Sequence, residues 1–220
     1  MKKPVGVWNY TVILTYLSLG CAVAGIFLSA AGHVYAACFL LLGSGLCDAF
    51  DGRVARSKKD RTELEKGFGI QIDSLTDVVA FGVLPAAMGS ALLGSSEALA
   101  ERPALLILSF VLLGLFVLAG LIRLAYFNVT EEELQQSGEG HRKFYLGFPI
   151  TTSCLYFPTF LLIRYLAGFD GAVLYAVLAF VLGALFIAPV KVPKPGLKGI
   201  LCLVLLAAAE LLVLILFSVF

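Results

Sequence analysis

The sequence predicts an all-α, polytopic transmembrane helix bundle of about seven spans. Of its 220 residues, 60% are hydrophobic and only 14% are charged, and the mean hydropathy is +0.97. A soluble domain carries about 25% charged residues, so this chain lacks the polar side chains needed to cover a globule. The apolar residues also fall in runs of about 20, the length at which a helix crosses a ~30 Å hydrocarbon core.

Seven such runs follow one another, over residues 9–31, 34–56, 71–95, 103–127, 145–167, 171–190 and 198–220. They are apolar on every face, unlike the alternating ~10-residue segments of a β-barrel. We expect the first run to be a retained helix, because it is longer than the roughly 7–15 apolar residues of a cleavable signal peptide. No break is long enough for a second domain. We therefore expect a single domain over 1–220, with a six-helix core at about 9–190 and an extra C-terminal helix at 198–220.

The lysines and arginines are divided unevenly between the two sides of this topology. If the N-terminus is cytoplasmic, only Arg102 and Arg164 fall outside, and the other fourteen fall on the cytoplasmic side. The positive-inside rule then places the longest polar connections, 57–70 and 128–147, in the cytoplasm. A net charge of +1 offers no field for nucleic acid, so we expect no nucleic-acid partner. The five cysteines are scattered and show neither disulfide nor zinc spacing.

Four aspartates stand where the second run ends and the third begins. Asp48 and Asp51 are three residues apart and Asp73 and Asp77 are four apart, so each pair lies on one helical face. An ionisable group in a membrane costs at least about 2.5 kcal/mol unless it meets a cavity or partner. Four carboxylates without His or Cys suit Mg²⁺ or Mn²⁺, and the pattern therefore predicts a metal site. The alternative is that the first pair only forms helix-end ion pairs with neighbouring arginines.

The residues around these aspartates resemble the signature of the CDP-alcohol phosphatidyltransferases. The matching pattern is Asp48-x2-Asp51-Gly52-x2-Ala55-Arg56, followed by Gly69-x3-Asp73-x3-Asp77. The gap between Arg56 and Gly69 is twelve residues, longer than is usual in the family. The extra residues fall in a charged stretch that we expect to be a loop, where insertion costs little.

Other stretches resemble the membrane-embedded phosphatidylserine synthases of that family. They are Ile72-Asp73-Ser74-Leu75, Phe81-Gly82-Val83, Arg123-Leu124-Ala125-x-Phe127-Asn128 and Gly147-Phe148-Pro149. The resemblance runs from about Thr15 to Pro195. It departs at Ser18, where those synthases often have Asn, and after Pro195, where one span follows instead of none or two.

The resemblance implies transfer of a phosphatidyl group from CDP-diacylglycerol to L-serine, giving phosphatidylserine and CMP, at the cytoplasmic face of the inner membrane. It implies two Mg²⁺ or Mn²⁺ ions held by Asp48, Asp51, Asp73 and Asp77, with Asp77 also the general base. CDP-diacylglycerol would be bordered by Ser18, Gly52, Ala55, Arg56 and Gly69. Arg56 suits a phosphate, although a helix-end arginine also reaches lipid headgroups without a ligand. We also expect a homodimer.

The candidate contacts for serine are cations near the same membrane depth. Arg123 lies in an otherwise uncharged span and needs an anion, either the serine carboxylate or a second phosphate. Arg142 and Lys143 enter the fifth run from the same side, and Thr151 follows them. Positive-inside anchoring explains Arg142 and Lys143 equally well.

Three other classes share some of these features. A transferase that makes phosphatidylglycerol phosphate or a phosphoinositol product shares the aspartate signature but should lack the Phe-Gly and Gly-Phe-Pro stretches. An intramembrane prenyltransferase also uses paired aspartates and magnesium, but on two separated loops of a larger bundle. A cation transporter or channel would use the carboxylates as an ion site. Metal-dependent release of CMP from CDP-diacylglycerol separates the transferases from the last two.

Overall fold

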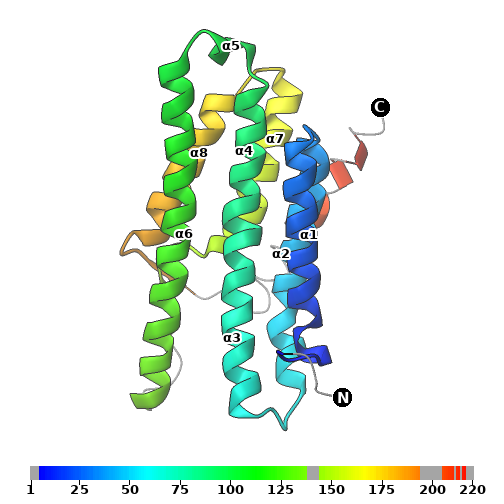
Figure 1. Ribbon diagram of the computed structural model, residues 1–220, viewed down its shortest axis with the longest axis vertical. Helices are drawn as coiled ribbons and strands as arrows, with labels where there is room; N and C mark the ends of the chain where they lie inside the picture. Colours follow the sequence, from blue (N-terminus) through cyan, green and yellow to red (C-terminus); the bar gives the residue numbers. More distant parts are fainter. Residues whose placement is uncertain (1–4, 138–143, 194–204, 211, 214, 217–220) are drawn as a thin grey trace.

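The computed structural model describes residues 5–137, 144–193, 205–210, 212–213 and 215–216. These residues form a bundle of helices with one short pair of strands (Figure 1). Five of the helical segments are long and apolar enough to cross a membrane. The predicted all-α polytopic membrane bundle is thus confirmed.

The first two helices follow the predicted spans. A 3-10 turn, Tyr10–Val12, leads into α1 (Ile13–Ala30), and α2 covers Val34–Ser57. The chain reverses between them at Gly32, which has a φ of +85°. Glycine adopts this left-handed conformation without steric cost, so the reversal needs only three residues.

The third span begins earlier than residue 71, where the third apolar run predicts its start. Helix α3 covers Glu63–Asp77 and starts at a capping box. The hydroxyl of Thr62 accepts a hydrogen bond from the backbone N–H of Glu65, and the Glu65 carboxylate accepts one from the backbone N–H of Thr62. The predicted loop 57–70 is therefore wrong beyond residue 62, because this charged stretch carries its own helix-start signal.

Helix α3 continues into α4 (Leu84–Gly94) through one π-helical turn, Val78–Val83. Pro85 follows this turn and has no backbone N–H. Wide turns of this kind interrupt α-helices frequently at functional sites. Here the turn comes directly after Asp77.

Helix α6 is longer than predicted. It follows the short α5 (Glu97–Ala100) and covers Pro103–Ser137, 35 residues or about 52 Å at 1.5 Å per residue. The predicted span 103–127 is only its apolar part. The expected loop 128–147 is wrong over residues 128–137, because the Glu, Leu and Gln residues there favour a helix.

The fifth span starts later than the predicted residue 145. Strand β1 (Phe144–Leu146) and a 3-10 turn, Ile150–Thr152, precede α7 (Ser153–Ala167). Gly147 lies between them with a φ of +75°, and a Cβ on it would stand 2.0 Å from the carbonyl oxygen of Phe186. The Gly-Phe-Pro sequence therefore makes a tight turn. Only glycine fits at its first position, Gly147.

Helix α8 (Ala172–Ile187) ends before the predicted residue 190. Ala188 is extended, with a ψ of 139°, as expected for a residue that precedes a proline. Strand β2 (Lys191–Pro193) then pairs antiparallel with β1. In the predicted span 198–220, residues 205–210, 212–213 and 215–216 are helical, and the others lie outside the described residues.

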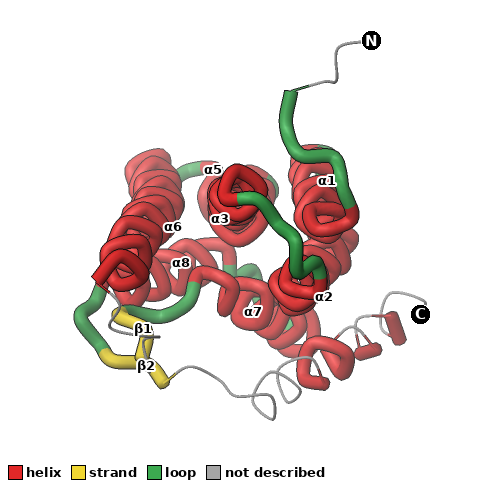
Figure 2. The backbone as a smooth tube through the Cα atoms, turned by 90° about the horizontal axis from the view of Figure 1, so that it is seen from below, coloured by secondary structure: helices red, strands yellow, loops and turns green. Residues whose placement is uncertain are grey.

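A buried aromatic cluster joins the helices of the second half. Phe116 of α6, Phe157 of α7 and Tyr175 of α8 are fully buried, and the ring centroids of Phe157 and Tyr175 are 4.7 Å apart. The Tyr175 hydroxyl donates to the carbonyl oxygen of Pro85 at 2.9 Å, which links α8 to α4. Seen end on, α6, α3 and α1 stand in one row and α8, α7 and α2 in a second (Figure 2).

The polar ends of three helices lie together. The start of α1, the connection 58–62 and the C-terminal end of α6 are at one end of the bundle, whereas α5 is at the other (Figure 1). The charge pattern predicts the same grouping, with the N-terminus and both polar connections on one side of the membrane.

Candidate active site

Three aspartates from α2 and α3 meet in the structure. Asp48, Asp73 and Asp77 each offer one carboxylate oxygen, and these oxygens all lie within 4.8 Å of one another. The four-residue spacing puts Asp73 and Asp77 on the same face of α3. Three oxygen donors this close suit a hard divalent cation, so the donor set fits a metal ion.

The fourth predicted aspartate, Asp51, joins the group through Asp73. Their carboxyl groups lie within hydrogen-bonding reach of each other, and the Thr15 hydroxyl donates to Asp51 at 3.3 Å. Two carboxylates at this distance repel unless a proton or a cation lies between them. The structure therefore brings all four aspartates together, as their spacing predicts.

The acidic cluster opens into a cavity of about 1160 Å³, here called the large cavity. Its polar wall comes from α2, α3 and α6 and includes Asp48, Asp73, Asp77, Arg123 and Asn128. Its apolar wall comes from α2, α7 and the C-terminal helix and includes Leu42, Gly45, Leu46, Leu155 and Ala207. One space thus combines a charged region with a surface suited to hydrocarbon.

A second cavity of about 190 Å³, here called the small cavity, lies on the Asp51 side of the cluster. Four of the five residues predicted to border CDP-diacylglycerol line it: Gly52, Ala55, Arg56 and Gly69. Asp73 and Arg56 line both cavities. The two spaces therefore meet at the acidic cluster.

The two glycines of the small cavity differ in their surroundings. A Cβ on Gly69 would meet no atom within 4 Å, so it would project into open space. A Cβ on Gly52 would stand 3.1 Å from a guanidinium nitrogen of Arg56, one turn further along α2. Gly52 therefore leaves room for the Arg56 guanidinium close to the backbone of α2.

Ser18 is placed differently from the other predicted residues. It is buried, its hydroxyl donates to the carbonyl oxygen of Ser44 at 3.4 Å, and the Ser44 hydroxyl donates to the Ser18 carbonyl at 2.9 Å. Ser18 is not among the described residues that line either cavity. Thr15, one turn earlier on α1, lines the small cavity instead. The sequence did not indicate that Thr15 lines this cavity, because it is a lone threonine in an apolar helix.

The structure describes two of the four residues that were predicted to contact serine. Arg123 and Thr151 both line the large cavity. Arg123 is 9% exposed, lies over the Phe127 ring at 5.8 Å and interacts electrostatically with Asp77. Arg142 and Lys143 lie outside the described residues.

Two further cations were not identified from the sequence. Arg61 and Lys66 line both cavities. They belong to the charged stretch that we expected to be an inserted loop. The capping box of Thr62 and Glu65 was the available signal, because it places Lys66 on a helix close to Gly69 and Asp73.

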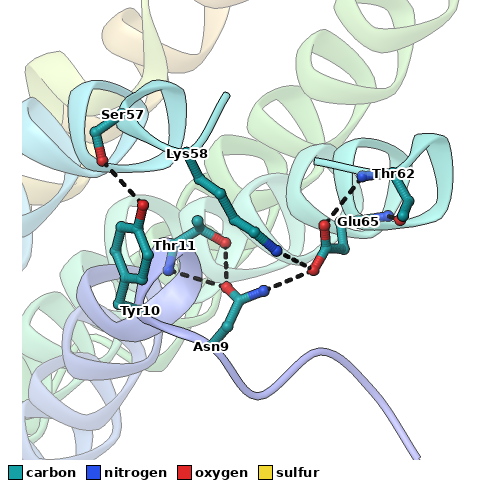
Figure 3. A network of polar contacts seen from close by, with 7 residues as sticks. All are labelled: Asn9, Tyr10, Thr11, Ser57, Lys58, Thr62 and Glu65. Atoms are coloured by element: carbon teal, nitrogen blue, oxygen red, sulfur yellow. Dashed lines mark hydrogen bonds and ion pairs between the residues drawn. The ribbon is translucent and has the colours of Figure 1, made fainter. Parts of the chain in front are cut away.

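A polar network holds the N-terminal segment beside the small cavity (Figure 3). The Glu65 carboxylate accepts hydrogen bonds from Lys58 Nζ at 2.7 Å and from Asn9 Nδ2 at 2.8 Å. The Asn9 side chain in turn accepts from the backbone N–H of Thr11 at 3.0 Å. Because Thr11 lines the small cavity, the network fixes one side of that cavity.

Comparison with known proteins gives several relatives of one kind. An archaetidylserine synthase of Methanothermobacter thermautotrophicus is 33% identical over 182 residues, 83% of this chain and 68% of the relative. A CDP-diacylglycerol–serine O-phosphatidyltransferase of Saccharomyces cerevisiae is 43% identical over 52% of this chain and 37% of the relative. One of the same name from Helicobacter pylori is 34% identical over 54% of this chain. The chain spans less than half the length of these last two relatives.

The model of one protein family matches almost the whole helical core. The match covers residues 8–189, from just before the 3-10 turn that precedes α1 to just after α8. It includes every residue of the acidic cluster and both cavities except Ala207. This match, together with the first relative, shows that the chain belongs to the CDP-alcohol phosphatidyltransferase family.

Proposed function

We propose that the protein transfers the phosphatidyl group of CDP-diacylglycerol to the hydroxyl of L-serine, giving phosphatidylserine and CMP. The observation that carries this proposal is the position of the four aspartates where a small polar cavity meets a large cavity with an apolar wall. The relatives support serine as the acceptor, because their names specify it. We assign the activity to the core at residues 9–190, with the C-terminal helix as an addition to one wall.

Divalent cations are the cofactor that this site favours. Asp48, Asp51, Asp73 and Asp77 would hold two ions, Mg²⁺ or Mn²⁺, since the donors are all hard carboxylate oxygens. When bound, such ions neutralise a diphosphate and stabilise the charge that develops on a leaving phosphate. Among the described residues, only Arg123 adds a buried positive charge beside this cluster.

The two cavities divide the lipid nucleotide between them. The cytidine end fits the small cavity, beside Gly69 and the guanidinium of Arg56, which can form paired hydrogen bonds with a phosphate. The acyl chains fit the apolar wall of the large cavity, near Leu46 and Leu155. The diphosphate then lies at the aspartates, where the cavities meet.

Asp77 is the best-placed general base for the acceptor. It is buried, lies in the large cavity and is close to Arg123, which would bind the serine carboxylate. A carboxylate oxygen of Asp77 accepts the proton of the serine hydroxyl as the hydroxyl oxygen bonds to the phosphorus that carries diacylglycerol. The bond from that phosphorus to the CMP oxygen breaks, and CMP leaves with the electron pair.

We place the protein in the inner membrane as a multi-pass homodimer, with the connection 58–62 and the acidic cluster facing the cytoplasm. The grouping of the lysine- and arginine-rich ends at one end of the bundle supports this orientation. Crosslinking in intact membranes tests the dimer.

The test is to incubate the purified protein with CDP-diacylglycerol or its ether-linked counterpart. Each reaction contains one acceptor, which is serine, glycerol 3-phosphate or inositol phosphate. We expect phosphatidylserine and CMP with serine, only when Mg²⁺ or Mn²⁺ is present. A lipid formed with glycerol 3-phosphate or inositol phosphate instead would establish another transferase of the family. No CMP release with any acceptor and metal would overturn the proposal and leave a cation site without transferase activity.

A further inference from the structure

Asn128 of α6 and Ser74 of α3 form a direct contact in the large cavity. The amide nitrogen of Asn128 donates to the Ser74 hydroxyl at 2.8 Å, across 54 residues of sequence. Both residues line the large cavity. Ser74 follows Asp73 directly and precedes Asp77 by three residues, so the contact lies beside the acidic cluster.

The hydrogen bond to Ser74 engages one end of the Asn128 amide. A carboxamide has two N–H donors and one carbonyl acceptor. In the structure Nδ2 donates to Ser74, and none of the described residues donates to Oδ1, so Oδ1 is the end of the amide that is left for a ligand. A cavity residue with its donor engaged and its acceptor open is suited to bind a donor.

The neighbouring charges indicate what that donor is. Arg123 lies five residues earlier on α6, about 7.5 Å along the helix axis, and lines the same cavity. If Arg123 binds the carboxylate of an amino-acid substrate, the ammonium on the adjacent carbon needs an acceptor nearby. Glycerol and inositol acceptors carry no such group.

We propose that Oδ1 of Asn128 accepts a hydrogen bond from the ammonium of the amino-acid acceptor, and that Ser74 is the positioning residue that holds the amide in this orientation. The inference rests on the proposed function and names the group that selects serine by its amino nitrogen. A site built to bind an N–H group rejects an analogue without it, because its polar atom is then left unpaired.

The experiment compares serine with 3-hydroxypropanoate, which is serine without its amino group. Asn128→Leu removes the acceptor with little change in size, and we expect the serine KM to rise roughly ten- to a hundredfold, the range for a hydrogen bond to a charged group. The inhibition constant of 3-hydroxypropanoate, competing with serine, should change less than about twofold, within the scatter of a neutral substitution. The KM for CDP-diacylglycerol should also stay unchanged.

Four variants separate recognition from support of the fold. Ser74→Ala should raise the serine KM less than Asn128→Leu, and the double variant should be no worse than Asn128→Leu, because Ser74 acts through Asn128. Asn128→Asp keeps an acceptor and should retain the preference for serine over 3-hydroxypropanoate. Ser109→Ala removes a hydroxyl that bonds only within α6, to the carbonyl oxygen of Leu105, and is the matched control.

Two results would overturn the inference. One is an equal rise in the serine KM and in the inhibition constant of 3-hydroxypropanoate, which would make the contact a link between α3 and α6 only. The other is an unchanged serine KM in Asn128→Leu. Both presuppose that the wild-type protein makes phosphatidylserine. A wild-type protein that does not use serine would instead overturn the proposed function.

Discussion

At the scale of single residues, the four aspartates have different surroundings and should respond differently to substitution. Asp51 lines the small cavity, Asp48 and Asp77 line the large one, and Asp73 lines both. We expect Asp77→Asn to lower kcat by about 10²- to 10⁴-fold, as for loss of a general base, while CDP-diacylglycerol still binds. Asp48→Asn, Asp51→Asn and Asp73→Asn should weaken metal and nucleotide binding as well. Steady-state kinetics and Mn²⁺ titration measure both effects.

The matched control for these variants is Asp60→Asn. Asp60 is an exposed acid in the 58–62 connection and is not among the described residues that line either cavity. It should keep wild-type kinetics and metal binding. Near-normal rates in both Asp77→Asn and Asp48→Asn would show that the metal-site interpretation is wrong.

Gly69 gives a second test at this scale. Gly69→Ala adds a methyl group to open space in the small cavity, so it should raise the KM for CDP-diacylglycerol on the order of tenfold, a cost of about 1.4 kcal/mol. The stability of the folded state should not fall, because alanine is up to about 1 kcal/mol more favourable than glycine within a helix. A thermal-unfolding measurement beside the kinetics distinguishes the two effects.

Gly114→Ala is the corresponding control. Gly114 also has no neighbour within 4 Å of an added Cβ, but it is exposed on α6 and is not among the described lining residues. Its KM values should equal those of the wild type. If the KM for CDP-diacylglycerol stays unchanged in Gly69→Ala, the proposal that the nucleotide binds in the small cavity is wrong.

The sequence predicts some of these residues and not others for a physical reason. Asp73 and Asp77 are four residues apart, and helix periodicity alone places them on one face. The contact of Ser74 with Asn128 spans 54 residues, so it depends on how α3 packs against α6. The same is true of Thr15, which reaches Asp51 on another helix, whereas the Ser18 hydroxyl donates to the carbonyl oxygen of Ser44.

At the scale of elements, the Glu65 network should act on the small cavity as a unit (Figure 3). Glu65→Gln and Lys58→Met each break the ion pair that measures 2.7 Å. We expect either change to raise the KM for CDP-diacylglycerol several-fold without changing the serine KM, because Thr11 lines only the small cavity. The double variant should be no worse than Glu65→Gln, since both side chains belong to one network.

Glu97→Gln, in the first turn of α5 at the opposite end of the bundle, is the control for this prediction. A change in the serine KM that equals the change for the lipid would indicate a general loosening of the fold. The network should also resist alkaline conditions. The hydrogen bond to Glu65 raises the pKa of Lys58 above the ordinary value of 10.5, so on the alkaline side the contribution of Lys58 is lost only as the pH rises beyond that value. On the acid side the ion pair is lost when the Glu65 carboxylate becomes protonated.

The ends of the helices are the features that the hydropathy and charge patterns predict least well. The capping box at Thr62 is readable from the sequence, but the high charge of residues 57–70 favoured a loop. The Glu- and Gln-rich stretch after residue 127 is polar enough to leave the membrane and still helical enough to extend α6 to Ser137. Hydropathy reports where a helix enters lipid, and local backbone chemistry determines where the helix begins and ends.

At the scale of the whole molecule, the prediction concerns orientation. Single cysteines in place of Ser57 and Glu133 should react with an impermeant reagent only from the cytoplasmic side, in a background without the five native cysteines. A cysteine in place of Glu101, beside α5 at the other end of the bundle, should react only from outside. The opposite pattern would reverse the orientation and put the acidic cluster on the outer face.

The wall that the two cavities share has a thermodynamic consequence. Because Asp73 and Arg56 line both spaces, a molecule that binds in one alters the electric field in the other. Such coupling is reciprocal: the factor by which CDP-diacylglycerol tightens serine binding is the factor by which serine tightens CDP-diacylglycerol binding, typically about 5- to 150-fold. Calorimetric titration of serine with and without CMP would measure the part of this coupling that comes from the nucleotide. Cooperative binding of the two substrates would then need no conformational change.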